Sequence, residues 1–149
     1  MSFQFERAFG GRRILVTGGA GFVGGAVVRR LVESGARVTV LDDLFTGRPE
    51  TIPTQAEFVE GSVCDQGLVR ELVARNSLIF HMAARNIIAS TANPRDDYET
   101  NIGGTLNVLL AARESRPDRC PSNVHALPLS TTDAKVVAGF IPRKINKLD

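Results

Sequence analysis

Short apolar runs alternate with longer amphipathic stretches along most of the chain. Four runs have the apolar and β-branched composition of buried strands, and they cover residues 14–17, 38–41, 56–59 and 77–80. Three longer stretches repeat apolar residues at the spacing of one helix face, over residues 23–34, 66–75 and 98–115. Gly35 follows the first of these stretches at the position of a helix C-cap. The pattern predicts strands that alternate with helices.

This alternation favours an α/β fold of the Rossmann type, with a doubly wound parallel sheet and helices on both of its faces. The pattern weakens after Arg116, where a candidate fifth strand over 124–132 is interrupted by Pro128. We therefore expect the sheet to be truncated after about the fifth strand. The predicted organisation is an N-terminal extension over 1–11, one domain over 12–132 and an irregular tail over 133–149.

Three glycines spaced three apart, Gly18, Gly21 and Gly24, lie directly between the first predicted strand and the first predicted helix. Such a turn lets the backbone approach a pyrophosphate, whose charge the helix N-terminus attracts. Asp42 ends the second strand, where a carboxylate accepts hydrogen bonds from the adenine-side ribose and repels the extra phosphate of NADP. The joint pattern predicts a dinucleotide-binding domain that prefers NAD, although Arg48 in the following loop leaves NADP open.

Composition and charge narrow the class of protein. The apolar fraction of 43% and the charged fraction of 23% are those of an ordinary soluble domain, and a net charge of +2 without a basic block argues against nucleic acid. No apolar run has the length of a membrane span, and Cys64 and Cys120 have no paired spacing, so we expect a reduced, cytoplasmic protein. His81 and His125 lack the spacing of a metal pair, and no metal site is predicted.

Five segments in a fixed order carry a family resemblance: residues 17–24, 41–47, 58–61, 79–84 and 101–108. They resemble the N-terminal portion of the extended short-chain dehydrogenase/reductase family, and their joint order is more specific than any single segment. The closer branch is that of the NAD-dependent sugar-nucleotide epimerases and dehydratases, of which UDP-glucose 4-epimerase is typical. The resemblance implies NAD as the cofactor, a nucleotide-sugar as the substrate and hydride transfer between the two.

The resemblance also implies a role for individual residues of the NAD site. Phe22 and Val23 are expected beside the pyrophosphate, and Asp42 at the adenine ribose. The ribose pocket is expected to be lined by Asp43, Leu44, Phe45, Thr46 and Gly47. The floor near the nicotinamide-side ribose is expected to consist of Met82, Ala83 and Ala84. Plain core packing at a strand end explains the composition of this floor about as well.

Two further positions are assigned to the cofactor site. Asn101 is expected to support the cofactor loop from the long helix, although a satisfied amide on a helix face fits the position too. The family usually has an aspartate after Gly61 that contacts the adenine amino group, whereas this chain has Ser62, followed by Val63. The Ser62 hydroxyl still accepts a hydrogen bond but loses its charge-assisted part, so weaker adenine binding is expected.

The catalytic residues of the family are largely missing. Family members use a Tyr and a Lys four residues later, with a Ser or Thr after the fifth strand. The sole tyrosine, Tyr98, precedes the long helix and has Ile102 four residues on, so the pair is absent. Ser130, Thr131 and Thr132 fall about where the Ser or Thr belongs, and Thr131 is the candidate catalytic residue. A polar loop fits this stretch equally well.

The spacing of the family places its Tyr beyond Asp149, which indicates a truncated chain. A shifted reading frame after about Arg116 would also explain why the resemblance fades. Two functions follow. The first is the NAD-binding part of a sugar-nucleotide epimerase or dehydratase, with a homodimer through the helix of 98–115 as one possible assembly. The second is a non-catalytic NAD-binding or cofactor-sensing module that acts through a partner.

Overall fold

Five parallel strands form one sheet in the computed structural model, which describes residues 7–115 and 136–138. The strands lie in the order β3-β2-β1-β4-β5, so β1 occupies the centre. Their bounds are β1 (Arg13–Thr17), β2 (Arg37–Asp42), β3 (Glu57–Glu60), β4 (Leu78–His81) and β5 (Val136–Ala138). All pairings are parallel, and Val16 of β1 lies between Val40 of β2 and Phe80 of β4. The predicted Rossmann-type sheet is confirmed.

The first four strands begin and end within one residue of the predicted bounds. The fifth strand is a correction, because β5 lies inside 133–149, which we expected to be an irregular tail. Three residues are too few to show an apolar run or an alternation, and only their pairing with Ile79, Phe80 and His81 defines the strand. The candidate strand over 124–132, and Thr131 with it, lies outside the described residues.

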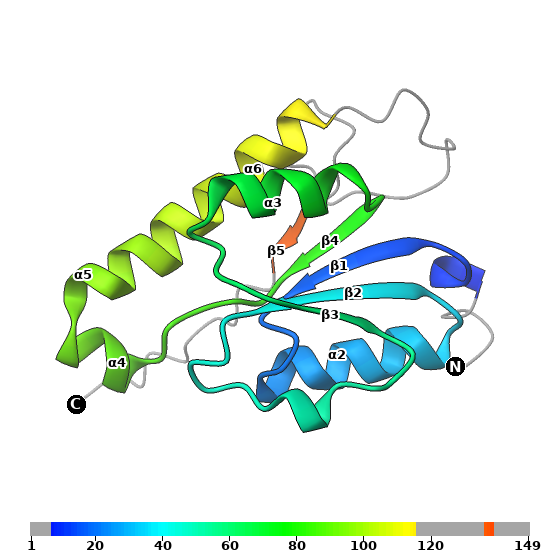
Figure 1. Ribbon diagram of the computed structural model, residues 1–149, viewed down its shortest axis with the longest axis horizontal. Helices are drawn as coiled ribbons and strands as arrows, with labels where there is room; N and C mark the ends of the chain where they lie inside the picture. Colours follow the sequence, from blue (N-terminus) through cyan, green and yellow to red (C-terminus); the bar gives the residue numbers. More distant parts are fainter. Residues whose placement is uncertain (1–6, 116–135, 139–149) are drawn as a thin grey trace, which may run out of the picture.

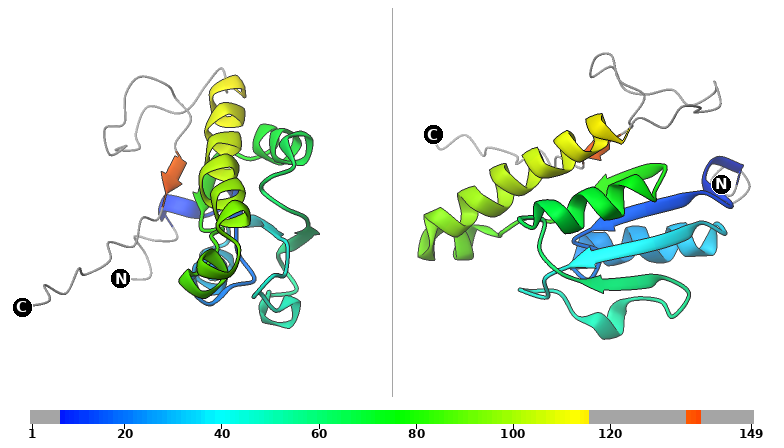
Figure 2. Two further views of the ribbon diagram at one scale, coloured as in Figure 1. Left: turned by 90° about the vertical axis from the view of Figure 1, so that its left-hand side faces the viewer. Right: turned by 45° about the horizontal axis from the view of Figure 1, so that its top comes forward.

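Helices cover both faces of the sheet (Figures 1 and 2). α2 (Phe22–Glu33) lies on one face, and α3 (Gln66–Ala74) and α6 (Thr105–Glu114) lie together on the other. Val16 packs in one core with Leu31 of α2, whereas Leu15 packs in a second core with Leu72 and Val108. Because both faces are buried, the central strands are continuous apolar runs rather than alternating ones.

The hydrophobic pattern predicts no element over 84–97, but two short helices lie there: α4 (Ile87–Ala92) and α5 (Pro94–Asp97). Each begins at an asparagine whose side chain accepts a backbone N–H, from Ala89 at Asn86 and from Asp96 at Asn93. The predicted long helix of 98–115 is also divided. It begins with a π-helical segment, η2 (Tyr98–Gly104), and continues as α6.

Two local features complete the domain. Gly35 has a φ of +78° after α2, as expected of a C-cap glycine, and a short 3₁₀ turn, η1 (Pro49–Thr51), follows the loop after β2. Phe9, from the predicted N-terminal extension, packs edge-to-face on Phe80 with ring centroids 6.0 Å apart.

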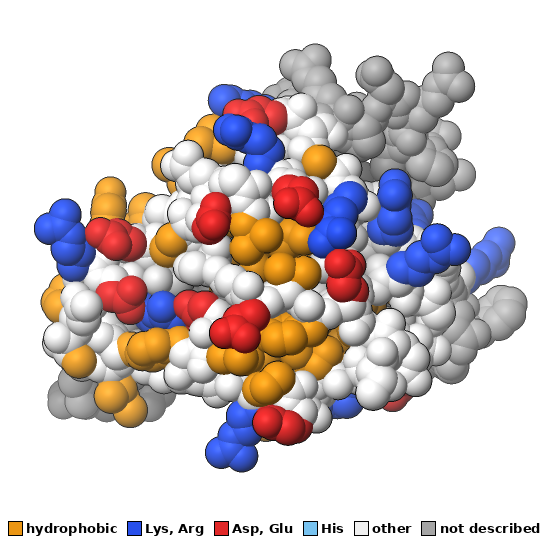
Figure 3. Space-filling view, in the orientation of Figure 1, with side chains coloured by type: hydrophobic (Ala, Val, Ile, Leu, Met, Phe, Trp, Pro, Cys, Tyr) orange, Lys and Arg blue, Asp and Glu red, His pale blue; other side chains and the backbone are white. Residues whose placement is uncertain are grey.

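The surface carries acidic and basic side chains on the same face, and apolar side chains lie along the outer edge formed by η2 and α6 (Figure 3). Among the described residues, no helix has the length and apolar character needed to cross a membrane.

Candidate functional site

The turn from β1 into α2 has the close contacts that require glycine. Gly18 has a φ of +70° and donates its N–H to the carbonyl of Leu41 at 2.8 Å. A Cβ added to Gly18 would lie 2.6 Å from the backbone nitrogen of Ala83, and one added to Gly24 would lie 2.0 Å from the Gly18 carbonyl oxygen. The turn is therefore wedged between α2 and the segment after β4, with no room for side chains.

The N-terminus of α2 opens toward the carboxyl edge of the sheet. Its N-cap, Gly21, offers no side-chain hydrogen bond, and the first turn contains no acidic residue. The first backbone N–H groups of a helix have no intrahelical partner, and the helix dipole adds a partial positive charge there. Phe22 stands at this point and is 97% exposed. The arrangement fits an anionic group such as a pyrophosphate.

Asp42 ends β2 at this edge and is buried, with 7% exposure. One carboxylate oxygen accepts the N–H of Ala20 and the other accepts the N–H of Leu44, both at 2.9 Å. Asp42 thus ties the glycine turn to the loop after β2, a role that sequence reasoning missed. A carboxylate oxygen has two lone-pair sites, so each oxygen keeps one for a ribose hydroxyl. Gly47 passes close by, since a Cβ there would lie 2.8 Å from Asp42 Oδ1.

A cavity lies where the loops after β1, β2 and β4 meet, which is where open parallel sheets bind ligands. Many predicted cofactor residues line it: Gly18, Gly21, Asp42, Asp43, Phe45, Thr46, Val63, Met82, Ala83 and Ala84. The lining also includes residues to which the sequence analysis assigned no role in cofactor binding: Leu41, Gly61, Arg85 and Thr100. The remaining predicted residues lie around the cavity without lining it: Phe22, Val23, Gly24, Leu44, Gly47, Ser62 and Asn101.

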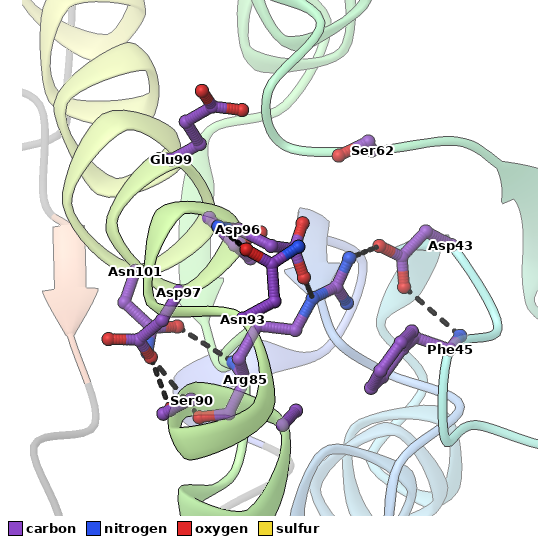
Figure 4. A network of polar contacts seen from close by, with 12 residues as sticks. Asp43, Phe45, Ser62, Arg85, Ser90, Asn93, Asp96, Asp97, Glu99 and Asn101 are labelled. Carbon is purple, nitrogen blue, oxygen red and sulfur yellow. Dashed lines mark hydrogen bonds and ion pairs between the residues drawn. The ribbon is translucent and has the colours of Figure 1, made fainter.

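Arg85 joins two walls of this cavity (Figure 4). Its guanidinium forms ion pairs with Asp43 at 2.9 Å and with Asp96 at 2.8 Å, and it lies 4.1 Å from the centre of the Phe45 ring. Burial acts to lower the pKa of this guanidinium, but the hydrogen bonds and charges of the two carboxylates outweigh it and raise the pKa. The only sequence signal was an arginine directly after the predicted floor of 82–84.

Asn101 holds the segment after β4 from the long helix. Its side-chain oxygen accepts the Arg85 N–H at 2.7 Å, and its amide nitrogen donates to the Arg85 carbonyl at 3.4 Å. The same nitrogen donates to Asp97 at 2.6 Å, which in turn accepts from the Ser90 hydroxyl. Both protons of the amide nitrogen are therefore taken up by protein groups, and the side chain acts on the cavity through residue 85.

His81 is buried at the end of β4. Thr105 donates its hydroxyl proton to the Asn101 carbonyl, so it accepts from His81 Nε2–H at 2.9 Å. His81 Nδ1 then accepts from the Thr17 hydroxyl at 2.7 Å. Burial lowers the pKa of His81, which favours this neutral form. The chain of bonds connects β1 through β4 to the long helix.

Two side chains of the segment after β3 accept hydrogen bonds from nearby backbone groups. Ser62 Oγ accepts the N–H of Cys64 at 3.2 Å, and Asp65 caps α3 by accepting the N–H of Leu68 at 3.0 Å. Val63 is 4% exposed and packs closely on the long helix, where a Cβ on Gly104 would lie 2.4 Å from its Cγ2. Val63 lines the cavity, whereas Ser62 does not.

The candidate catalytic residues are either exposed or outside the described residues. Tyr98 is 60% exposed at the start of η2, and Ile102, at the family's Lys spacing, is 57% exposed. Thr131 lies outside the described residues. Within residues 7–115 and 136–138, no group of three or more His, Cys, Asp or Glu side chains is placed to hold a metal ion.

The fold and the site together define a nucleotide-binding domain of the Rossmann type. The model of the NAD dependent epimerase/dehydratase family matches residues 14–133. A putative UDP-glucose 4-epimerase of Methanocaldococcus jannaschii is 38% identical over 108 residues, which are 71% of this chain and 35% of the relative. The chain belongs to the NAD dependent epimerase/dehydratase family, and it spans about a third of the length of such relatives.

Solved structures agree with this assignment. An epimerase of Methanothermobacter thermautotrophicus superposes with a TM-score of 0.72 at 35% identity, covering 77% of this chain and 35% of the other. The UDP-glucose 4-epimerase of Thermus thermophilus, solved in complex with NAD, superposes with a TM-score of 0.65 at 38% identity. The match covers 69% of this chain and 34% of the other.

Proposed function

We propose that this chain binds NAD at the carboxyl edge of its sheet, as the cofactor-binding part of a sugar-nucleotide epimerase or dehydratase. One observation carries the proposal: the uncapped N-terminus of α2 and the buried carboxylate of Asp42 meet at one cavity edge, in a chain of an NAD dependent family. The first suits a pyrophosphate and the second a ribose diol, which are the two polar parts of the adenosine half of NAD.

Residues of the chain would bind and orient the cofactor. Gly18, Gly21 and Gly24 admit the pyrophosphate to the backbone, beside Phe22 and Val23. Asp42 holds the adenine ribose, and the loop after β2 encloses it. Met82, Ala83 and Ala84 form a floor of small and flexible residues under the nicotinamide-side ribose. When bound, NAD supplies hydride transfer with a carbon of a nucleotide-sugar.

The catalytic pair that the family resemblance implies is not found in this sequence. The Tyr and Lys pair that the family resemblance implies has no counterpart, because the sole tyrosine is Tyr98 and Ile102 stands four residues later. We therefore propose that the 149-residue chain binds NAD without completing a reaction on a sugar. The same observation favours the alternative function, a non-catalytic module that binds or senses NAD and acts through a partner.

Calorimetric titration with NAD and NADP tests the cofactor, with Asp42→Asn as the variant and Asp65→Asn as the matched control. The wild-type chain should bind NAD more tightly than NADP. Asp42→Asn should weaken NAD binding by about tenfold, since a charge-assisted hydrogen bond is lost, and it should reduce the preference for NAD over NADP. Asp65→Asn should bind like the wild type, because asparagine also caps helices well. A wild-type chain that does not bind NAD would overturn the proposal.

An absorbance assay for NADH with UDP-glucose then separates binding from turnover. Binding without NADH formation or sugar conversion is the expected result. Turnover by the isolated chain would show that catalytic residues other than the family's pair are present.

Assembly and location complete the proposal. The outer face of the long helix carries four exposed apolar residues: Tyr98, Ile102, Leu106 and Leu109. We propose that this face pairs with the same helix of a second copy of the chain. A nucleotide-sugar is the proposed substrate of the complete enzyme. The free thiol of Cys64 is consistent with a reducing, cytoplasmic setting, which we also propose.

A further inference from the structure

Arg85 lines the cavity and is held by two carboxylates and an aromatic ring, and the proposed NAD site leaves its role unexplained. We infer that Arg85 is a positioning residue that clamps the adenosine side of the cleft, by fixing the loop after β2 against the segment after β4. The inference rests on the proposed binding of NAD. It assigns affinity for the adenosine half of the cofactor to a residue outside the glycine turn and the ribose-binding carboxylate.

The contacts of Arg85 join elements far apart in the sequence. Arg85 Nη2 pairs with Asp43 Oδ2 at 2.9 Å, and Arg85 Nε donates to Asp96 Oδ2 at 2.8 Å. Asp43 belongs to the loop after β2 and Asp96 to α5. The Arg85 side chain is only 12% exposed, against 29% for Asp43 and 36% for Asp96. The pair with Asp43 is therefore shielded from solvent far better than a surface ion pair.

Phe45 is the part of the loop that the clamp holds over the cavity. The guanidinium carbon of Arg85 lies 4.1 Å from the Phe45 ring centroid, within the range of a cation–π contact. The ring is otherwise 54% exposed, and its backbone N–H donates to Asp43 Oδ1 at 3.1 Å. Arg85 thus fixes both the carboxylate and the ring that line one wall of the cavity (Figure 4).

The far end of the clamp is anchored as well. Asp96 donates its backbone N–H to Asn93 Oδ1 at 3.3 Å, and the backbone of Arg85 is held on both sides by Asn101. The Nε and Nη2 groups of the guanidinium are both taken up by carboxylates at fixed positions. One cation between two anions also leaves the trio with a net negative charge. Arg85 is therefore suited to hold the walls in place and not to attract the pyrophosphate itself.

The test begins with three variants of the full chain: Arg85→Met, Asp96→Asn and the control Arg95→Met. Arg95 forms a solvent-exposed pair with Glu99 at 3.2 Å, its side chain 87% exposed, so its loss removes an arginine from the same region without touching the clamp. Asp96 does not line the cavity, so any effect of its variant on ligand binding must act through Arg85. Titrations with NAD and with ADP separate the two halves of the cofactor.

Arg85→Met should weaken binding of NAD and of ADP by the same factor, about tenfold, with most of the change in the dissociation rate. Asp96→Asn should give a smaller loss in the same direction, and Arg95→Met none. Arg85→Lys should recover part of the affinity, because it restores the charge without the fork. In an Asp43→Asn background, the effect of Arg85→Met should shrink, since the two residues act together.

Results that overturn the inference are distinct from a failure of the proposed function. If the wild type binds NAD and folded Arg85→Met binds NAD within twofold of it, Arg85 is not a clamp. A loss for NAD without a loss for ADP would place Arg85 at the nicotinamide half instead. Should Arg85→Met not fold, the Asp96→Asn titration decides, and wild-type affinity there refutes the inference. A wild type that binds neither ligand refutes the proposed function and this inference with it.

Discussion

Gly24 illustrates how single atoms set the geometry of the proposed cofactor site. An added Cβ at this position would lie 2.0 Å from the carbonyl oxygen of Gly18 and 2.9 Å from Cα of Gly19, both of them backbone atoms. Backbone cannot rotate aside as a flexible side chain does. The start of α2 would have to move away from the turn, and the N–H groups that face the cavity edge would move with it.

Gly24→Ala should therefore lower the free energy of unfolding by about 2 kcal/mol and abolish NAD binding. Gly67→Ala is the matched control, because an added Cβ there meets nothing closer than 3.4 Å and alanine favours the helix. Urea unfolding and NAD titration of both variants measure the two effects. Wild-type NAD affinity in Gly24→Ala would contradict the assigned contact.

His81 makes the stability of the fold depend on pH. Its folded-state pKa lies below the ordinary histidine pKa of 6.5, because burial disfavours the charged ring. The unfolded chain therefore binds the proton first as the pH falls. The stabilising effect is complete above 6.5 and is lost as the pH falls toward the folded-state pKa.

The free energy of unfolding should thus decrease below pH 6.5, by up to about 1.4 kcal/mol per pH unit from this one proton. Unfolding curves at several pH values between 7.5 and about 5 measure the slope. His81→Asn should be less stable at neutral pH but should lose this part of the slope. An unchanged slope in the variant would assign the effect to other groups.

At the residue scale, the sequence predicted the site residues that belong to a local motif. It missed those whose positions depend on contacts between distant segments. The glycines and Asp42 belong to one strand–turn–helix pattern, so their neighbourhood followed from spacing. Arg85 reaches the cavity from a segment without a hydrophobic period, and Thr100 from a polar position of the predicted long helix, so neither position followed from a local motif. Asp42 shows a mixed outcome: its place was predicted, but its two backbone hydrogen bonds were not.

At the scale of elements, burial explains which boundaries the sequence predicts well. β1 and β2 lie between two helical layers, so their apolar runs begin and end with the strands themselves. α4 and α5 depend on the side-chain caps of Asn86 and Asn93 rather than on an apolar face, and the hydrophobic pattern misses them. β5 is too short to show a pattern and depends on its pairing with β4.

α3 offers a test of capping that is separate from cofactor binding. Asp65 accepts the N–H of Leu68 at 3.0 Å and lies outside the cavity lining. Asp65→Ala should lower the free energy of unfolding by about 1 kcal/mol and leave NAD affinity unchanged, and Asp65→Ser should restore most of the loss. Denaturant unfolding and calorimetry measure both quantities. A large loss of NAD affinity in folded Asp65→Ala would contradict a purely capping role for Asp65.

At the scale of the whole molecule, the long helix faces two ways. Val108, Ala111 and Ala112 are buried in the core with α3, whereas Leu106 and Leu109 are about half exposed. Exposed apolar stripes of this kind often mark surfaces that pair with another chain. The outer edge seen in Figure 3 is thus the surface on which assembly should depend.

Light scattering over a range of protein concentrations should show a dimer that Leu106→Glu weakens by at least tenfold, about 1.4 kcal/mol, because a charge would be buried in the pairing face. Ile88→Glu is the control, since Ile88 is 77% exposed on α4 and away from this stripe. A wild type that stays monomeric at every concentration, or equal weakening by both variants, would rule out pairing through this face.

The π-helical segment η2 sets the rotational phase of the long helix. Before it ends, Thr100 and Asn101 are directed at the cofactor cleft and its supporting loop; after it, Val108 and Ala111 are directed at α3. In a regular α-helix each residue advances about 100°, so deleting one residue from Tyr98–Gly104 would turn one set by about that angle relative to the other. The length of this helix is therefore constrained. After a single-codon deletion here, the chain could keep the orientation needed for cofactor binding or the one needed for core packing, but not both.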